Sequence, residues 1–365
     1  MIRMTCALLS CCSVLLSITS SQVLAAPAPK IWPIGQISRS YHPSVPRNWR
    51  ESKNQALNVL VWYPTTTESK LVAVEIGPAG HKLFKGHPVV ESAEIAAGIH
   101  PLILLSHGTA EGPDSLDWLA AALAERGYIV VGVSHPGNNA MGPLTATGFQ
   151  LWWERATDLS ETLDAILKDP QFATAIDSAH IGAVGFSLGG YTVLELAGAT
   201  TDRDAFVRFC HGKSADATCT PPELRAQLTT SHFDEADPDT AQSITHSADS
   251  YRDPRIHAVL AISPTLGMAF GANNLAGIAV PVKLVAGDSD VTVPIETNVL
   301  RYARLIPGAS LTLIPRAGHY IFLNECLPEG KALLALICRD TPGVERDMVH
   351  QQTIDLAMDF FTSHL

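Results

Sequence analysis

Short, predominantly apolar runs recur along the chain, and each ends at a glycine, serine or proline. Strands buried on both faces, as in a parallel sheet, read as continuous apolar runs of this kind. Segments of helical composition separate them. This alternation predicts the α/β class: one mostly parallel central sheet, flanked by helices and joined by right-handed crossovers. The runs are 100–108, 128–137, 180–187, 255–263, 280–287 and 309–315, preceded by a strand-like segment at 56–64.

Two stretches depart from this alternation. Residues 1–25 join Arg3 to an apolar core and small residues, which is typical of a signal peptide cleaved after Ala25. Residues 201–254 hold paired prolines and an acidic segment, and we interpret them as a cap-like insertion. The sequence therefore predicts a signal peptide at 1–25 and a single domain at 26–365. Such a protein is exported to the periplasm or secreted.

Four cysteines follow the predicted signal peptide. An even number of cysteines in an exported chain indicates two disulfides, for which three connectivities exist. The short spacings favour Cys210–Cys219 and Cys326–Cys338. A zinc site of four thiolates does not fit, because the C-x-x-C spacing is missing.

The charge balance limits the partners. The chain has 25 basic and 36 acidic residues, a formal charge of −11, which disfavours nucleic acid and anionic membranes. Beyond the signal peptide no apolar stretch is long enough to span a bilayer. We therefore expect a small-molecule or lipid-like substrate that is neutral or partly apolar. The oligomeric state cannot be read from the sequence.

The stretch GFSLGG places Ser187 between an apolar run and a helical segment. A strand that turns directly into a helix forces its central residue into strained backbone angles, and flanking glycines give the room for this turn. The serine hydroxyl is then held at a helix N-terminus, where free N–H groups stabilise a developing anion. We therefore predict Ser187 as a nucleophile, with an ordinary tight turn as the alternative.

A serine hydroxyl needs a base to take its proton. His319 lies in the loop after the last predicted strand, within a turn of small residues. His107 and His135 also end strands, but both precede Ser187, whereas the expected order is serine, acid, histidine. We predict His319 as the general base.

The base in turn needs a carboxylate that fixes its tautomer and stabilises the imidazolium. Asp288 and Asp290 both follow the strand-like run 280–287. Asp290 lies further out and is favoured as the acid, while Asp288 is the alternative and otherwise forms the turn.

The oxyanion of a tetrahedral intermediate needs two donors. We predict the backbone N–H groups of Leu188, directly after the nucleophile, and of Thr109, in the loop LLSHGTAEG (104–112) that follows an early strand. An ordinary strand-to-helix turn is the alternative for this loop. The predicted chemistry requires no metal or organic cofactor, and the acidic segment 232–239 lacks the ligand spacing of a calcium loop.

Taken together, these motifs resemble those of the α/β-hydrolase superfamily. Within it the chain is similar to exported proteins labelled predicted dienelactone hydrolases or platelet-activating-factor acetylhydrolase-like esterases. The pieces that carry the resemblance include LLSHGTAEG, GFSLGG, AGDSDVTVP and AGHYIFL, and together they cover most of 56–323. The resemblance implies a triad of Ser187, Asp290 and His319.

Two departures limit what can be transferred. Plasma-type acetylhydrolases carry their acid one strand earlier, and the matching segment here, AISPTLG, has no aspartate. Dienelactone hydrolases use a cysteine nucleophile, whereas this chain has serine. The fold and the triad therefore transfer, and the names do not.

The predicted function is a serine esterase that cleaves carboxylic esters, with short acyl chains, through an acyl-enzyme on Ser187. The alternatives are a lipase or phospholipase A2-like lipid esterase, an acyltransferase, and an inactive hydrolase fold that only binds. Three tryptophans fit either a core or an acyl pocket, with the core favoured: Trp118, Trp152 and Trp153.

Overall fold

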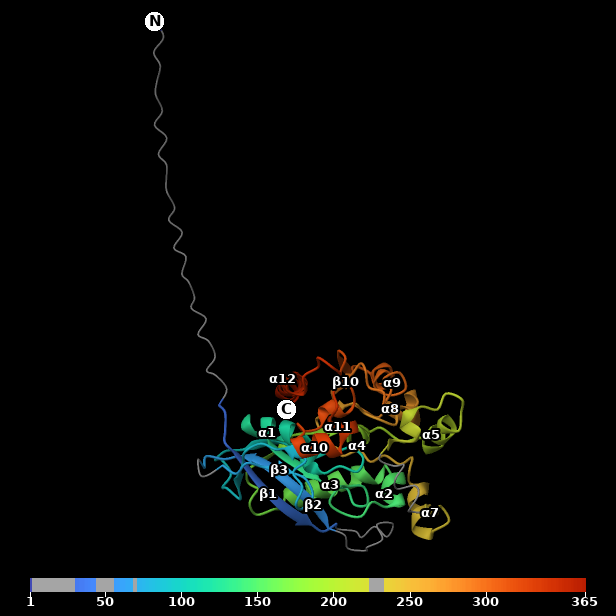
Figure 1. The fold of residues 1–365 in the computed structure, drawn as a ribbon, viewed down its shortest axis with the longest axis horizontal. Helices are drawn as coiled ribbons and strands as arrows, with labels where there is room; N and C mark the ends of the chain where they lie inside the picture. Colours follow the sequence, from blue (N-terminus) through green and yellow to red (C-terminus); the bar gives the residue numbers. More distant parts are fainter. Residues whose placement is uncertain (2–29, 44–55, 68–70, 223–232) are drawn as a thin grey trace. The chain divides into compact units, whose positions relative to one another are not determined.

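A nine-stranded sheet forms the centre of the described part of the computed structural model (Figure 1). Its strand order is β11-β10-β9-β8-β6-β7-β2-β1-β5. Residues 1, 30–43, 56–67, 71–222 and 233–365 are described; the predicted signal peptide lies outside them, except for residue 1. Residues Ile31–Leu365 form one compact unit. The strands are β1 (Ile34–Tyr41), β2 (Leu57–Pro64), β5 (Val90–Glu91), β6 (His100–Ser106), β7 (Ile129–Val133), β8 (Ile176–Phe186), β9 (Ala258–Ile262), β10 (Val282–Gly287) and β11 (Ser310–Ile314); β3 (Glu75–Ile76) and β4 (Phe84–Lys85) pair separately.

The six strands β6 to β11 pair in parallel with their neighbours, and β2 joins β7 in antiparallel register. All five residues of β7 and of β9 are buried, as expected of strands covered on both faces. The prediction of a mostly parallel α/β sheet is confirmed. A further strand, β1, lies before the runs that the sequence indicated, and it pairs along its whole length with β2.

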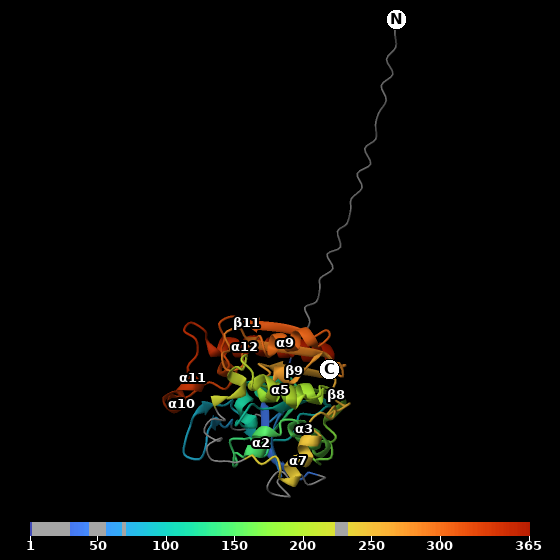
Figure 2. The same cartoon turned by 90° about the vertical axis from the view of Figure 1, so that its right-hand side faces the viewer.

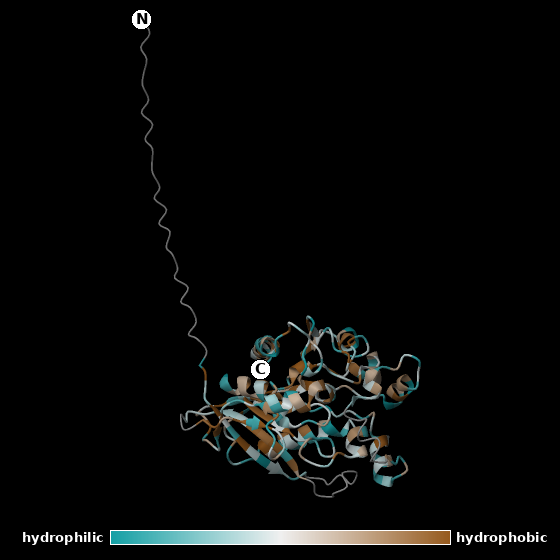
Figure 3. Cartoon of the chain, viewed as in Figure 1, coloured by the Kyte–Doolittle hydropathy of each residue, from teal (hydrophilic) through white to brown (hydrophobic). Residues whose placement is uncertain are grey.

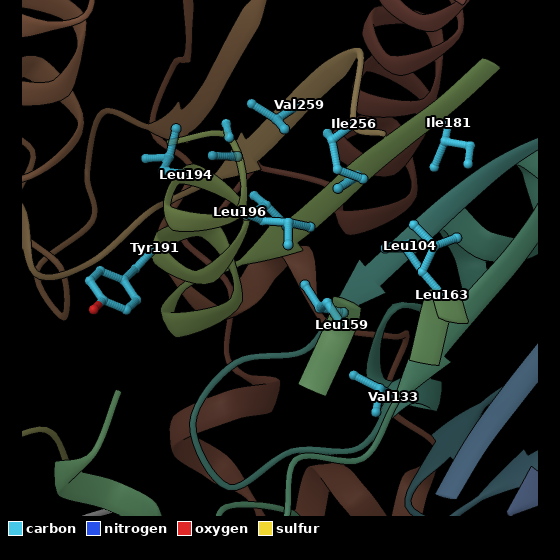
Figure 4. Packing of buried hydrophobic residues seen from close by; sticks show 14 of the residues in the cluster. Leu104, Val133, Leu159, Leu163, Ile181, Tyr191, Leu194, Leu196, Ile256 and Val259 are labelled. Carbon is cyan, nitrogen blue, oxygen red and sulfur yellow. The ribbon is translucent and has the colours of Figure 1, made fainter. Parts of the chain in front are cut away.

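The helices cover both faces of this sheet. One core cluster packs α3 (Glu154–Ile166), α4 (Leu188–Leu196) and α9 (Val299–Leu305) on one face. A second packs α1 (Asp117–Glu125) and α12 (Arg346–His364) on the other. Figure 4 shows Leu159 and Leu163 of α3 close to Leu104 and Val133 of the sheet. Apolar residues concentrate along the strands of the sheet (Figure 3).

The remaining helical segments are short: η2 (Pro113–Leu116), α2 (Ala146–Gln150), α5 (Arg203–Cys210), η3 (Ala217–Cys219), α7 (Pro238–Thr245), η4 (Gly267–Ala269), α8 (Ala272–Leu275), η5 (Tyr320–Phe322), α10 (Pro328–Leu333) and α11 (Ala335–Cys338). In Figure 1, α2, α5 and α7 lie together on the right, the side that faces the viewer in Figure 2. No helix in the described ranges is both long and apolar enough to cross a bilayer.

Both predicted disulfides are confirmed, Cys210–Cys219 and Cys326–Cys338. The first joins the end of α5 to η3 within the 201–254 stretch, and the second joins the segment after η5 to α11. Each disulfide closes a short loop, with sequence separations of 9 and 12, rather than linking distant parts of the chain.

Candidate active site

Ser187 stands at the turn between β8 and α4, with φ of 54° and ψ of −115°. A side chain on either flanking glycine would collide with backbone there. A Cβ on Gly185 would lie 2.1 Å from the carbonyl oxygen of Gly189, and one on Gly189 would lie 1.9 Å from that of Ser106. The glycines therefore let α4 begin at once and press directly on the end of β6.

The structure brings Ser187, His319 and Asp290 into one hydrogen-bonded chain. His319 Nε2 lies 3.0 Å from Ser187 Oγ, and His319 Nδ1 lies 2.6 Å from Asp290 Oδ2. A carboxylate can only accept, so Nδ1–H donates to Asp290 and the bare Nε2 accepts from the serine hydroxyl. All three residues are largely buried, with exposed fractions of 7% for Ser187 and 5% for each of the others.

The two aspartates after β10 have different surroundings. Asp290 Oδ1 accepts from the backbone N–H groups of Thr292 at 3.0 Å and Val293 at 2.7 Å, which fixes the carboxylate toward His319. Asp288 is exposed, and its Oδ1 accepts instead from the N–H of Arg316 at 2.6 Å. Asp288 therefore closes the turn between β10 and the histidine loop.

Thr109 and Leu188, which carry the two predicted oxyanion donors, line the same cavity as Ser187. Leu188 is the first residue of α4, so its N–H has no helical carbonyl to bind. Thr109 lies between two N–H groups that already have acceptors: Gly108 N donates to Glu111 Oε2 at 2.8 Å, and Ala110 N donates to Asn138 Oδ1 at 2.7 Å. Within the described part of the chain, the N–H of Thr109 has no acceptor.

The cavity over Ser187 holds about 100 Å³ and has mostly apolar walls. Trp152 lines it, whereas Trp118 and Trp153 are buried in the core, so the acyl-pocket alternative suits one of the three tryptophans. The first disulfide contributes Cys219 to the wall. The other apolar lining residues are Phe149, Leu188, Phe206, Pro221, Leu266, Val293 and Tyr320.

A second serine–histidine–aspartate set, which was not predicted, includes Ser106 at the end of β6. Ser106 Oγ lies 2.8 Å from His135 Nε2, and His135 Nδ1 lies 2.8 Å from Asp158 Oδ2. None of these three residues is more than 1% exposed, so no substrate can reach them. Arg155 is buried beside them. One sequence signal could have identified Arg155 and Asp158. Both fall on the helix face that carries Leu159 and faces the core.

Among the residues that the structure describes, no group of three or more histidine, cysteine, aspartate or glutamate side chains could hold a metal ion.

Comparisons with known proteins agree with the architecture. A family model described as "Alpha/beta hydrolase family" matches residues 102–326. No curated protein matches the chain. Among solved structures, a ferulic acid esterase from Streptomyces cinnamoneus is similar, with a TM-score of 0.64 and 20% sequence identity, covering 93% of this chain and 92% of the other. At that identity the likeness shows the fold.

The two disulfides provide a matched pair for testing the cavity wall. Their loops are of similar length, with sequence separations of 9 and 12, so replacing either pair by serine should lower the free energy of unfolding by about 2–3 kcal/mol. Only Cys219 lines the cavity. We expect C210S/C219S to raise KM for p-nitrophenyl acetate by about fivefold or more, with C326S/C338S within about twofold of wild type. Equal effects on KM would contradict a structural role of the first disulfide in the cavity.

Proposed function

The chain belongs to the alpha/beta hydrolase family, and on that premise we propose that it is a carboxylic ester hydrolase whose nucleophile is Ser187. The observation that carries the proposal is the hydrogen-bonded chain from Ser187 Oγ through His319 to Asp290, at 3.0 and 2.6 Å. An activated serine requires this arrangement of nucleophile, base and orienting acid.

The first half of the proposed reaction forms an acyl-enzyme. Ser187 Oγ attacks the ester carbonyl carbon while His319 Nε2 takes the hydroxyl proton, and Asp290 stabilises the imidazolium that results. The carbonyl oxygen becomes an oxyanion, which accepts from the N–H groups of Leu188 and Thr109. When the intermediate collapses, His319 returns its proton to the departing alkoxide. The products are an alcohol and an ester of Ser187.

The second half repeats these steps with water. His319 takes a proton from a water molecule as it attacks the acyl carbon, and the oxyanion again accepts from Leu188 and Thr109. Collapse releases the carboxylic acid, and the proton passes from His319 back to Ser187 Oγ. Only neutral His319 can accept a proton, so the reaction slows as acid protonates it.

The cavity favours a small and neutral acyl group. Its volume of about 100 Å³ and its aromatic walls suit a short apolar chain. Glu111 also lines it, and a carboxylate there repels an anionic substrate. A solved structure of the same fold is named a ferulic acid esterase, which is consistent with ester hydrolysis on this scaffold.

We further propose that the protein is exported after cleavage near Ala25. Two disulfides in the folded chain support this location, because disulfides persist in oxidising compartments.

Hydrolysis of p-nitrophenyl esters from acetyl to palmitoyl tests the proposal. We expect kcat/KM to be highest for acetyl or butyryl and at least about tenfold lower at octanoyl, because longer chains exceed the cavity. Ser187→Ala should lower kcat by about 10⁴-fold or more, because members of a triad fail together. A rate maximum at palmitoyl would favour the lipid-esterase alternative. An unchanged rate in Ser187→Ala would remove the serine from the reaction.

The aspartate pair offers a sharper test of the acid. Asp290→Asn keeps an oxygen for the Thr292 and Val293 N–H groups but turns a donor toward His319, so kcat should fall by about 10⁴-fold. Asp288→Asn is the matched control, because it makes the same change two residues away; we expect less than about a tenfold loss. Steady-state kinetics of both purified variants decides between them, and the reverse ranking would make Asp288 the acid.

A further inference from the structure

The two proposed oxyanion donors belong to separate parts of the chain. Thr109 lies in the loop after β6, and Leu188 begins α4, so the fold must hold these two elements at a fixed separation. An oxyanion hole works only when its donors stand at about 2.7–3.1 Å from the developing charge. A group that contacts both elements would therefore control the geometry of the hole.

Arg155, in the first turn of α3, is such a group. Its Nη2 donates to the carbonyl oxygen of His107, two residues before Thr109, and to Ser106 Oγ at 3.4 Å. Its Nε donates to Thr192 Oγ1 at 3.1 Å on α4. The guanidinium therefore links the end of β6 to the first turns of α4.

Thr192 extends this link to the second donor. Its hydroxyl donates to the carbonyl oxygen of Leu188 at 2.8 Å, while its oxygen accepts from Arg155. Thr192 is fully buried, so no water competes for these contacts. A continuous path of hydrogen bonds therefore runs from the carbonyl oxygen of Leu188 through Thr192 and Arg155 to the carbonyl oxygen of His107.

Burying this arginine is costly, and packing alone does not require it. Arg155 is only 3% exposed, and its Nη1 has no hydrogen-bond partner among the described residues. Burial lowers the pKa of the guanidinium to about 9, while Glu111 favours the charged form, so it remains charged at neutral pH. An apolar side chain of similar volume would fill the same space without the desolvation cost.

A second set of contacts holds the other side of the loop. The backbone N–H of His135 donates to His107 Nε2 at 3.2 Å, and His135 is held by Asp158. Burial and the neighbouring Arg155 lower the pKa of His107 well below its usual value, which keeps its imidazole neutral and able to accept. These contacts fix the loop to the sheet, but they do not reach α4.

We infer that Arg155 is a positioning residue of the oxyanion hole, which sets the separation between the N–H groups of Thr109 and Leu188. The inference rests on the proposed function. Arg155 touches neither the substrate nor the reacting atoms, and it acts through the two backbone segments that it joins.

The test combines Arg155→Met, Arg155→Lys, Thr192→Val and the double variant Arg155→Met/Thr192→Val. Each is assayed for hydrolysis of p-nitrophenyl acetate and for inhibition by a short-chain trifluoromethyl ketone, which forms an oxyanion on the nucleophile. Thr192→Val is nearly isosteric and keeps the test informative if Arg155→Met folds poorly. Arg255→Met is the matched control. Arg255 lies just before β9, pairs with Asp253 and with Asp164 of α3, and does not line the cavity.

For Arg155→Met we expect kcat to fall about 10- to 100-fold with KM within about threefold. Affinity for the ketone should fall by the same factor as kcat/KM, because both report on the oxyanion. Thr192→Val should show the same pattern with a smaller loss. The double variant should be no worse than Arg155→Met within about twofold, because both substitutions break one path. Arg255→Met should change the thermal midpoint and leave both kinetic parameters within about twofold.

Three results would overturn the inference while leaving the proposed function intact: wild-type kcat and ketone affinity in Arg155→Met, full recovery in Arg155→Lys, or multiplicative losses in the double variant. Full recovery by lysine would mean that charge alone matters. If the ketone does not inhibit the wild-type protein and Ser187→Ala retains its activity, the proposed function itself fails.

Discussion

The contact between α4 and the carboxyl end of β6 is the one on which the site depends. Gly189 lies so close to the Ser106 carbonyl that any side chain there would overlap it. This approach lets the helix start directly after Ser187 and packs its first turn against the end of β6, the strand that leads into the loop of Thr109. A positive φ at a serine costs about 1–3 kcal/mol. Two backbone hydrogen bonds hold Ser187 in this conformation: its N–H donates to Ile262 at the end of β9, and its carbonyl oxygen accepts from the N–H of Thr265.

Access, rather than geometry, distinguishes the two serine–histidine–aspartate sets. The hydrogen bonds within the set of Ser106, His135 and Asp158 are similar in length to those of the proposed triad. The residues of this second set are, however, fully buried. In such a buried layer each polar contact is strong, and each missing one is costly. The buried set is therefore closed to substrate, whereas Ser187 and His319 of the proposed set line the cavity.

The sequence predicted those parts of the fold that local chemistry determines. Apolar runs indicated the parallel strands, the glycines around Ser187 indicated the turn, and short spacings indicated the disulfides. Tertiary contacts decided the rest. A break at 151–153 separates α2 from α3, where Trp153 turns inward and its Nε1 donates to Ser243 of α7 at 3.0 Å. Nothing near that break in the sequence signals it. Arg155 was missed because a charged residue is normally read as solvent-facing.

The central claim is that Ser187 becomes covalently acylated, and trapping the nucleophile tests it most directly. The purified protein is treated with a fluorophosphonate and analysed by intact mass and peptide mapping, beside Ser187→Ala. The account predicts one adduct per chain, located on Ser187, and none in the variant. An adduct on another residue, or equal labelling of Ser187→Ala, would contradict it.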